Sequence, residues 1–146
     1  MEEKYLVIYP SGKLAWAKLE RKPRYNEVYN GEEALDIKDI AKVIDCEWCE
    51  QVYTSIPDVV MMVDEVGKVR LDPKPHNELA SRLYYGWNPM HQDDIVGTVV
   101  LFALRPVGPL QEMELFPLNF NQLMLVCEKM GIRELIFTDE EVSSDG

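Results

Sequence analysis

The sequence predicts an α+β fold, in which two to three helices pack against a mixed or mainly antiparallel sheet. Runs of apolar and β-branched residues are typical of strands, and they occur irregularly between segments with a helical spacing of apolar residues. A regular alternation would instead predict a doubly wound parallel sheet. The expected strands span residues 5–9, 14–19, 47–54, 59–63, 69–71, 94–104 and 135–137, and the expected helices span residues 30–44, 77–85 and 120–130.

The chain has 146 residues, the length of one ordinary domain, and no repeat, low-complexity tract or linker interrupts it. We therefore expect a single α+β domain over residues 1–138. The segment 139–146 carries acidic side chains and no base, so this tail is predicted to be disordered.

Local signals define several of these elements. Pro10-Ser11-Gly12 lies between the first two expected strands and predicts a β-hairpin. Asn30, with Glu33 three residues later, approaches a capping box and predicts the start of the first helix. We expect a loop at residues 105–109, and Gly131 is expected to end the last helix.

The runs at 59–63 and 94–104 are the most apolar, so we expect them to share one sheet and to be buried on both faces. A turn is predicted at residues 64–68, before the return strand at 69–71. Gly97 lies inside the second run, where a glycine packs nothing. Its position predicts a bulge with positive φ or a close approach by another part of the chain.

The net charge is −11, and a surface of that sign repels the phosphate backbone of nucleic acids. We therefore expect no direct nucleic-acid binding. No apolar run reaches the roughly 18 residues of a membrane helix, and the N-terminus lacks the features of a secretory signal. The three cysteines argue against a disulfide framework. A cytoplasmic location is expected.

The acidic residues are unevenly distributed. The segment 27–65 carries eleven acids against two lysines, a net charge of −9. The helix dipole explains the acids near the start of the first helix. The others form either a solubilising surface or a face that binds a basic partner, as a DNA mimic would. This acidic face is predicted to contain Glu47, Glu50, Asp58, Asp64 and Glu65.

Cys46 and Cys49 form a Cys-x-x-Cys motif. A redox motif of this kind usually opens a helix, whereas this one follows a helix and enters a strand. A structural zinc needs two further ligands, and the residues Cys127, His76 and His91 supply no second pair. We therefore expect buried cysteines with no metal and no cofactor, and a redox or zinc role is the alternative.

A helix end and loop at residues 83–91 gather aromatic side chains, an amide and a histidine. Loop aromatics either stack on a planar ligand, anchor a partner or fold back over the core. The residues predicted to bind are Asn77, Tyr84, Tyr85, Trp87 and His91.

No catalytic motif is recognisable, because neither a Gly-x-Ser-x-Gly elbow nor a phosphate-binding glycine loop occurs. The adjacent carboxylates Asp64–Glu65 and Asp93–Asp94 could, with His91, form a metal-dependent site. Neighbours on a strand point to opposite faces, however, which argues against such a site.

The central block combines several motifs in a definite order: an apolar strand at 59–63, the turn Asp64-Glu65-x-Gly67-Lys68, the helix start Asn77-x-Leu79-Ala80, and the strand Asp94-x-x-Gly97-Thr98. In this order the chain resembles domain-of-unknown-function family thirty-eight forty-six, over roughly residues 4–105. The resemblance implies a small protein of phages, plasmids or integrated elements, and it implies no known activity.

Together these observations favour a non-enzymatic binding protein of a phage or mobile element, whose acidic face engages a basic host protein. The first alternative is a binder of a nucleotide-like small molecule near residues 84–91. The second is a metal-dependent enzyme. A protein partner is expected, and a membrane is not.

Overall fold

The computed structural model describes residues 2–23, 33–69, 72–84, 95–132 and 142–143. In chain order its elements are β1 (Glu2–Ile8), β2 (Leu14–Glu20), β3 (Lys22–Pro23), β4 (Glu33–Ala34), α1 (Ile37–Ile44), β5 (Cys49–Tyr53), β6 (Val59–Asp64), α2 (Glu78–Leu83), β7 (Val99–Val107), β8 (Glu112–Phe116), α3 (Phe120–Met130) and β9 (Val142–Ser143).

Seven strands form one sheet in the order β5-β6-β7-β1-β2-β9, with β8 paired to β7 beside this path. The pairs within it are antiparallel, except that β2 and β9 run parallel. The short strands β3 and β4 form a separate two-stranded sheet. An α+β fold with a mainly antiparallel sheet is thus confirmed.

The expected first hairpin is present, and so is the expected common sheet for the two most apolar runs. β1 pairs with β2 over its whole length, and the hairpin turns where the N–H of Gly12 donates to the carbonyl of Tyr9 at 2.9 Å. β6 pairs with β7 from Val59 opposite Ala103 to Met62 opposite Val100. The two most apolar runs of the sequence therefore share one sheet, as predicted, and they pair directly within it.

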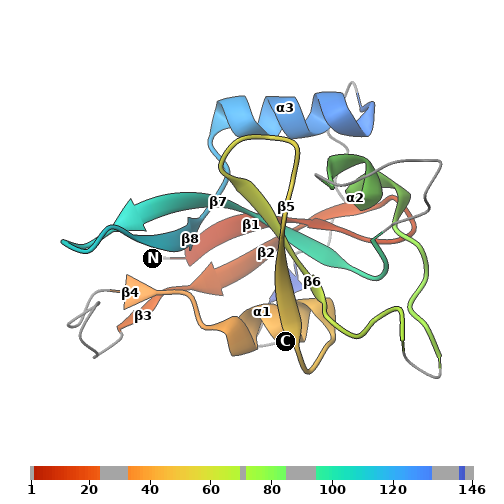
Figure 1. Cartoon of the computed structure of the whole chain (residues 1–146), viewed down its shortest axis with the longest axis horizontal. Coiled ribbons are helices and arrows are strands. Elements are labelled where there is room, and N and C mark those ends of the chain that lie inside the picture. Colours follow the sequence, from red (N-terminus) through yellow and green to blue (C-terminus); the bar gives the residue numbers. More distant parts are fainter. Residues whose placement is uncertain (1, 24–32, 70–71, 85–94, 133–141, 144–146) are drawn as a thin grey trace.

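Helices cover both faces of the sheet (Figure 1). One core lies under α2 and α3, and the other lies under α1. Successive residues of each central strand alternate between these cores, so every residue of β6 is buried. The first core includes Leu6, Met61, Leu101, Leu83 and Val126, and the second includes Tyr5, Val60, Phe102, Ile40 and Ile44. No helix of the described residues has the length and apolar character needed to cross a membrane.

The first helix begins later than predicted. Its N-cap is Asp36, whose side chain accepts a hydrogen bond from the N–H of Lys38 at 2.9 Å. Glu33 lies in β4, where cross-strand pairing with β3 holds the backbone extended, and Asn30 is outside the described residues. The Asp36 carboxylate caps the helix immediately before its apolar repeat, so it defines the start.

The other two helices match the prediction closely. α2 follows Asn77, and α3 spans Phe120–Met130. Asn119 and Gln122 form a capping box at the start of α3, and Gly131 ends the helix with a φ of 75°.

The strand β7 is displaced along the chain relative to the prediction. It begins after Gly97, whose φ of 77° interrupts the extended backbone, and it runs on to Val107. The expected loop at 105–109 is therefore wrong in its first half. Pro106 lies opposite Met113 in a second hairpin, because the fixed φ of proline is compatible with an extended strand. The strand β8 has no counterpart in the prediction.

Two expected strands, at residues 69–71 and 135–137, and the expected disordered tail lie partly or wholly outside the described residues. Val69 lies in a turn, and the rest of the expected return strand, like the expected strand at 135–137, is outside the described residues. Within the tail predicted to be disordered, Val142 and Ser143 pair with Ala17 and Lys18 of β2. This short parallel pairing adds β9 to the edge of the sheet.

Candidate functional site

A buried ion pair lies at the end of β6 that faces α1. Asp64 Oδ2 and Lys74 Nζ are 3.0 Å apart, and their side chains are 1% and 13% exposed. Asp64 Oδ1 also accepts a hydrogen bond from the N–H of Val66 at 3.0 Å. The ammonium donates further to the carbonyls of Ile44 and Asp45, so Lys74 also caps the C-terminus of α1. Sequence reasoning missed Lys74, because no motif surrounds it.

Gly97 explains how Lys74 reaches this position. A Cβ at residue 97 would lie 2.7 Å from Cδ of Lys74, so the lysine stem passes where any other residue would have a side chain. Gly97 also has a φ of 77°, which glycine adopts without strain. A positive φ at a bulge and a close approach were predicted as alternatives for this glycine, and the structure shows a positive φ together with a close approach.

Asn77 is a buried structural residue. Its side chain accepts a hydrogen bond from the N–H of Ala80 and donates to the carbonyls of Ile8 and Gly97, at 3.1, 3.0 and 2.8 Å. The side chain is therefore not on the surface, where a binding role would require it. Its polar chemistry caps α2 and joins this helix to the end of β1 and to the segment before β7, which is the physical reason for the asparagine.

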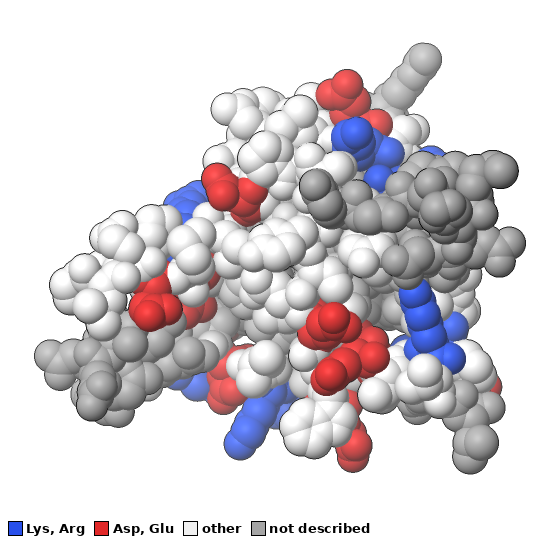
Figure 2. All heavy atoms as spheres, viewed as in Figure 1, with Lys and Arg blue, Asp and Glu red and all other residues white. Residues whose placement is uncertain are grey.

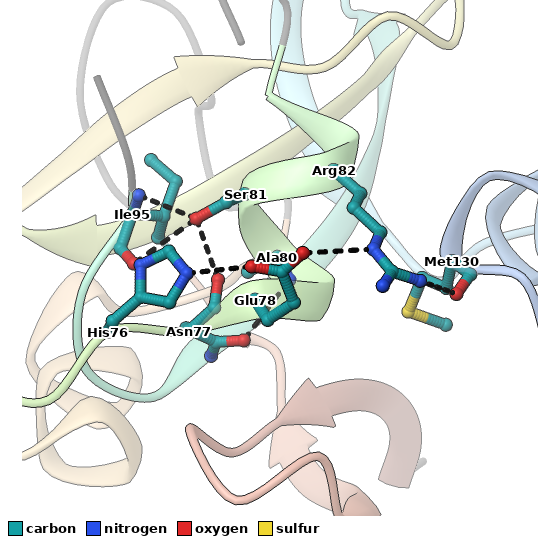
Figure 3. A network of polar contacts seen from close by, with 8 residues as sticks. All are labelled: His76, Asn77, Glu78, Ala80, Ser81, Arg82, Ile95 and Met130. Carbon is teal, nitrogen blue, oxygen red and sulfur yellow. Dashed lines mark hydrogen bonds and ion pairs between the residues drawn. The ribbon is translucent and has the colours of Figure 1, made fainter. Parts of the chain in front are cut away.

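A network of polar contacts runs from this cap along α2 (Figure 3). Ser81 Oγ donates to the carbonyl of Asn77 at 2.7 Å and accepts from the N–H of Ile95 at 2.9 Å. On the exposed side, Glu78 contacts His76 and Arg82, and Arg82 donates to the carbonyl of Met130 at the end of α3. The hydrogen bond from His76, followed by that from Arg82, lowers the pKa of Glu78. The network joins α2 to α3 and needs no ligand to explain it.

The cysteine pair lies between α1 and β5. The sulfur atoms of Cys46 and Cys49 are 3.1 Å apart, and both residues are half-buried. Burial raises the pKa of both thiols, to about 12 for Cys49, where the contact with Cys46 adds to the effect. Both cysteines are therefore protonated thiols at neutral pH. The described residues contain no group of three or more His, Cys, Asp or Glu side chains that could hold a metal ion.

The strand β5 offers the most distinctive exposed surface. Among the described strands, β5 pairs with β6 alone and forms one edge of the sheet, and directly after β5 a bridge from Thr54 to Tyr84 covers the outer side of the chain. Trp48, immediately before the strand, is 64% exposed, and Tyr53, its last residue, is 65% exposed. Large aromatic side chains are thus exposed at both ends of an edge strand, where they can contact a partner that pairs with the strand.

The backbone pattern shows which groups of β5 face outward. The N–H of Thr54 donates to the carbonyl of Val59, and the N–H of Glu65 donates to the carbonyl of Trp48. Hydrogen-bonded and non-hydrogen-bonded pairs alternate along an antiparallel ladder. The N–H and C=O groups of Cys49, Gln51 and Tyr53 therefore point away from β6, toward the outer edge.

Exposed carboxylates surround this edge. Glu47, Glu50, Asp58 and Glu65 are all exposed, and no lysine or arginine of the described residues forms an ion pair with them. Figure 2 shows acidic side chains gathered over the lower part of the β5–β6 hairpin, with basic side chains to either side. Asp58 and Tyr53 line a common hollow of about 260 Å³ at the far end of β5. We call β5, Trp48 and these four carboxylates the β5 edge.

Four of the residues predicted for the acidic face are exposed, whereas Asp64 is buried and does not belong to that surface. Asp64 is buried because strand alternation turns its side chain toward α1, where Lys74 neutralises it. Of the predicted binding residues, Asn77 is buried, and Tyr84 is half-buried, bridges to Thr54 and packs on the core. Tyr85, Trp87 and His91, with Asp93 and Asp94 of the metal hypothesis, lie outside the described residues.

Sequence reasoning did not single out Trp48, Gln51 or Tyr53. Their signal was present, because the expected strand at 47–54 contains polar residues on both faces, which is typical of an edge strand. What the sequence lacked was the order of strands, which places this one at the end of the sheet.

Comparisons with known proteins found no matching family model, no matching curated protein and no matching solved structure. The resemblance to domain-of-unknown-function family thirty-eight forty-six therefore stays a prediction.

Proposed function

We propose that this protein is a non-enzymatic binding protein that accepts a basic, extended segment of a partner protein along the β5 edge. One observation carries the proposal: the outward backbone groups of Cys49 and Gln51 have no partner strand within the described structure, and exposed aromatic and acidic side chains surround them. Such an edge is a template for an incoming strand.

The incoming strand would pair with the outward N–H and C=O groups of Cys49 and Gln51, because the bridge from Thr54 to Tyr84 covers the chain beyond Tyr53. Backbone pairing supplies affinity without specificity, so the side chains around the edge must select the partner. Glu47, Glu50, Asp58 and Glu65 favour lysine and arginine in that partner, and the flat faces of Trp48 and Tyr53 add cation–π contacts. Proteins commonly protect an edge with lysine or proline, and β5 contains neither.

The resemblance described above extends this proposal to a biological setting. A protein of a phage or mobile element would meet proteins of its host, and a basic host protein fits the charge of the β5 edge. The four exposed acids lie within or at the ends of one pair of strands, β5 and β6, instead of over a broad surface, which favours a single extended segment over the mimicry of a DNA duplex.

A small-molecule site has weaker support. Tyr84 lines a hollow of about 260 Å³ together with Glu50, Glu65 and Lys68. Sites for drug-sized ligands usually measure about 300–1,000 Å³ and are mostly apolar, so a nucleotide-like ligand fits this hollow poorly. A metal-dependent reaction at Asp64 has less support still, because this carboxylate is already paired with Lys74.

The proposal can be tested with a defined probe, a ten-residue peptide in which lysine alternates with valine. We expect its addition to shift the backbone amide NMR signals of Cys49, Gln51 and Tyr53. Binding should weaken roughly tenfold between low and moderate salt, since exposed charges are screened over about 10 Å at 0.1 M salt. An otherwise identical peptide with glutamate in place of lysine should not bind.

Two pairs of variants separate charge from backbone pairing. Glu47→Lys with Glu50→Lys should abolish binding of the peptide, whereas reversal of the exposed Glu112 and Glu128, which lie on β8 and α3, should not. Gln51→Pro removes one outward N–H while leaving the β5–β6 ladder intact, and Gln51→Ala is its control. Peptide binding that survives both Gln51→Pro and the Glu47 and Glu50 reversals would overturn the proposal.

A further inference from the structure

The Cys-x-x-Cys segment has a geometry suited to oxidation. Cys46 follows the left-handed C-cap of α1, and its N–H donates to the carbonyl of Ala41 at 3.1 Å. Cys49 is the first residue of β5 and lies opposite Asp64 in the ladder. Two regular elements therefore hold the sulfur atoms 3.1 Å apart, and a disulfide of about 2.05 Å requires an approach of about 1 Å.

One of the two thiols is also accessible. Cys46 lines a groove of about 750 Å³ between the end of α1 and the end of β6, whereas Cys49 is not among its lining residues. Lys38 and Lys42 line the same groove, and so do Asp45, Glu47 and Asp64, so its charges are mixed. A small molecule that carries a sulfur atom can therefore approach Cys46 first, through this groove.

We propose that Cys46 and Cys49 are a redox site that closes to an intramolecular disulfide by exchange with a small-molecule disulfide such as oxidised glutathione. The thiolate of Cys46 attacks one sulfur of oxidised glutathione, forms a mixed disulfide and releases one glutathione thiolate. The thiolate of Cys49 then attacks the Cys46 sulfur and releases the second. The two protons of the cysteines end on the two reduced glutathione molecules, so two thiols are oxidised and one disulfide is reduced.

Formation of this disulfide would restrict the backbone at one end of β5. Glu47 and Trp48 are the two residues between the cysteines, so the disulfide closes a short loop around them. Both residues belong to the β5 edge, and restriction of their backbone would change how that edge is presented. This consequence for binding rests on the proposed function, whereas the formation of the disulfide does not.

The exchange should be slow at neutral pH and faster at higher pH. Burial raises the pKa of both thiols, and only the thiolate attacks. Below those pKa values the thiolate fraction rises about tenfold per pH unit, so we expect a nearly tenfold faster reaction at pH 8 than at pH 7. The charged and titratable groups that face Cys46 are Cys49, Asp64, Lys74, Asp45 and the groove residues Lys38, Lys42 and Glu47.

The test uses the full reduced chain in glutathione buffers of increasing oxidised fraction, with acid quenching, alkylation and peptide mass mapping. We expect a disulfide between Cys46 and Cys49, with Cys127 still alkylated, at a rate independent of protein concentration. The folded chain should reach half oxidation at a roughly tenfold lower proportion of oxidised glutathione than a peptide of residues 44–51, because folding holds the sulfur atoms together.

Variants identify the order of attack. Cys49→Ser should leave glutathione attached to Cys46, Cys46→Ser should react more slowly, and the control Cys127→Ser should form the same disulfide as the original chain. Two outcomes overturn the proposal: pairing that involves Cys127 or a second chain, or a folded protein that is no easier to oxidise than the peptide. Neither outcome depends on whether a basic peptide binds to β5.

Discussion

Asp64 and Glu65 are neighbours in the sequence with opposite environments. Asp64 is the last residue of β6, turned toward α1, buried and paired with Lys74. Glu65 follows it, is exposed and has no ion-pair partner among the described residues. One carboxylate holds parts of the fold together and the other is available at the β5 edge. A count of acids along the chain cannot distinguish these two roles.

The same division applies to the whole acidic segment. Asp36 caps α1, and Asp39 is buried and contacts Lys22 at 3.0 Å. Asp45 is the left-handed C-cap of that helix. The net charge of −9 therefore contains a structural part inside or at the ends of elements, and an exposed part around β5. Only the exposed part can attract a partner.

The strongest test of this comparison removes the partner of the buried carboxylate. Lys74→Met should destabilise the protein by about 3–5 kcal/mol, since it leaves the charge of Asp64 buried and unpaired. The variant also removes the donor to the two carbonyls at the end of α1. The free energy of unfolding in urea is the measurement.

The matched control is Lys13→Met, which removes an exposed lysine and should change the unfolding free energy by less than about 0.5 kcal/mol. Adding Asp64→Asn to Lys74→Met should recover part of the loss, because no buried charge then remains. A similar cost for the variants at Lys74 and Lys13 would show that the Asp64–Lys74 pair does not stabilise the fold.

A second test concerns the path of the lysine stem. Gly97→Ala should cost more than Gly12→Ala, although both glycines have positive φ. At Gly12 a Cβ meets nothing within 4 Å, so only the left-handed backbone is penalised, by roughly 1–2 kcal/mol. At Gly97 the Cβ also meets Lys74, which three interactions hold in place, and this adds about 1 kcal/mol or more.

Urea unfolding of the two variants measures the difference directly. Gly97→Val should be more destabilising than either alanine variant, because a β-branched residue tolerates positive φ least. In the background of Lys74→Met, the difference in unfolding free energy between the variants at residues 97 and 12 should shrink. The new Cβ then meets a methionine side chain that no ion pair holds in place and that can move aside. Equal costs at positions 12 and 97 would contradict the close approach.

Some of the features in these two tests could be predicted from the sequence, and others could not. The β-hairpin, the central pair of strands, the last helix and the unusual role of Gly97 follow from local composition, which a single sequence contains. The partner of Gly97 could not be predicted, because Lys74 reaches it through a loop with no periodic pattern. Asn77 was predicted to bind, but its burial could not be predicted, because the carbonyls of Ile8 and Gly97 that it bonds are distant in the sequence.

The candidate site shows the same limit. The acidic residues around β5 were visible as charges, but their exposure depends on strand order and on the direction of each side chain. Strand order is decided by long-range pairing, such as β1 with β7, that no local pattern encodes. The separation of Asp64 from Glu50 and Glu65 therefore required the three-dimensional structure.

The smallest expected effect on stability belongs to the exposed carboxylates, and it completes the comparison. Glu50→Gln combined with Glu65→Gln should change the unfolding free energy by no more than about 0.5 kcal/mol, and in the stabilising direction, because it relieves repulsion between like charges. Salt screens the same repulsion, so the melting temperature of the original chain should rise from low to moderate salt, and that rise should be smaller in the variant. Circular dichroism melts at two salt concentrations measure both effects. A loss of stability as large as that of Lys74→Met would mean that these carboxylates are structural after all, and the β5 edge would then have no spare charge with which to select a partner.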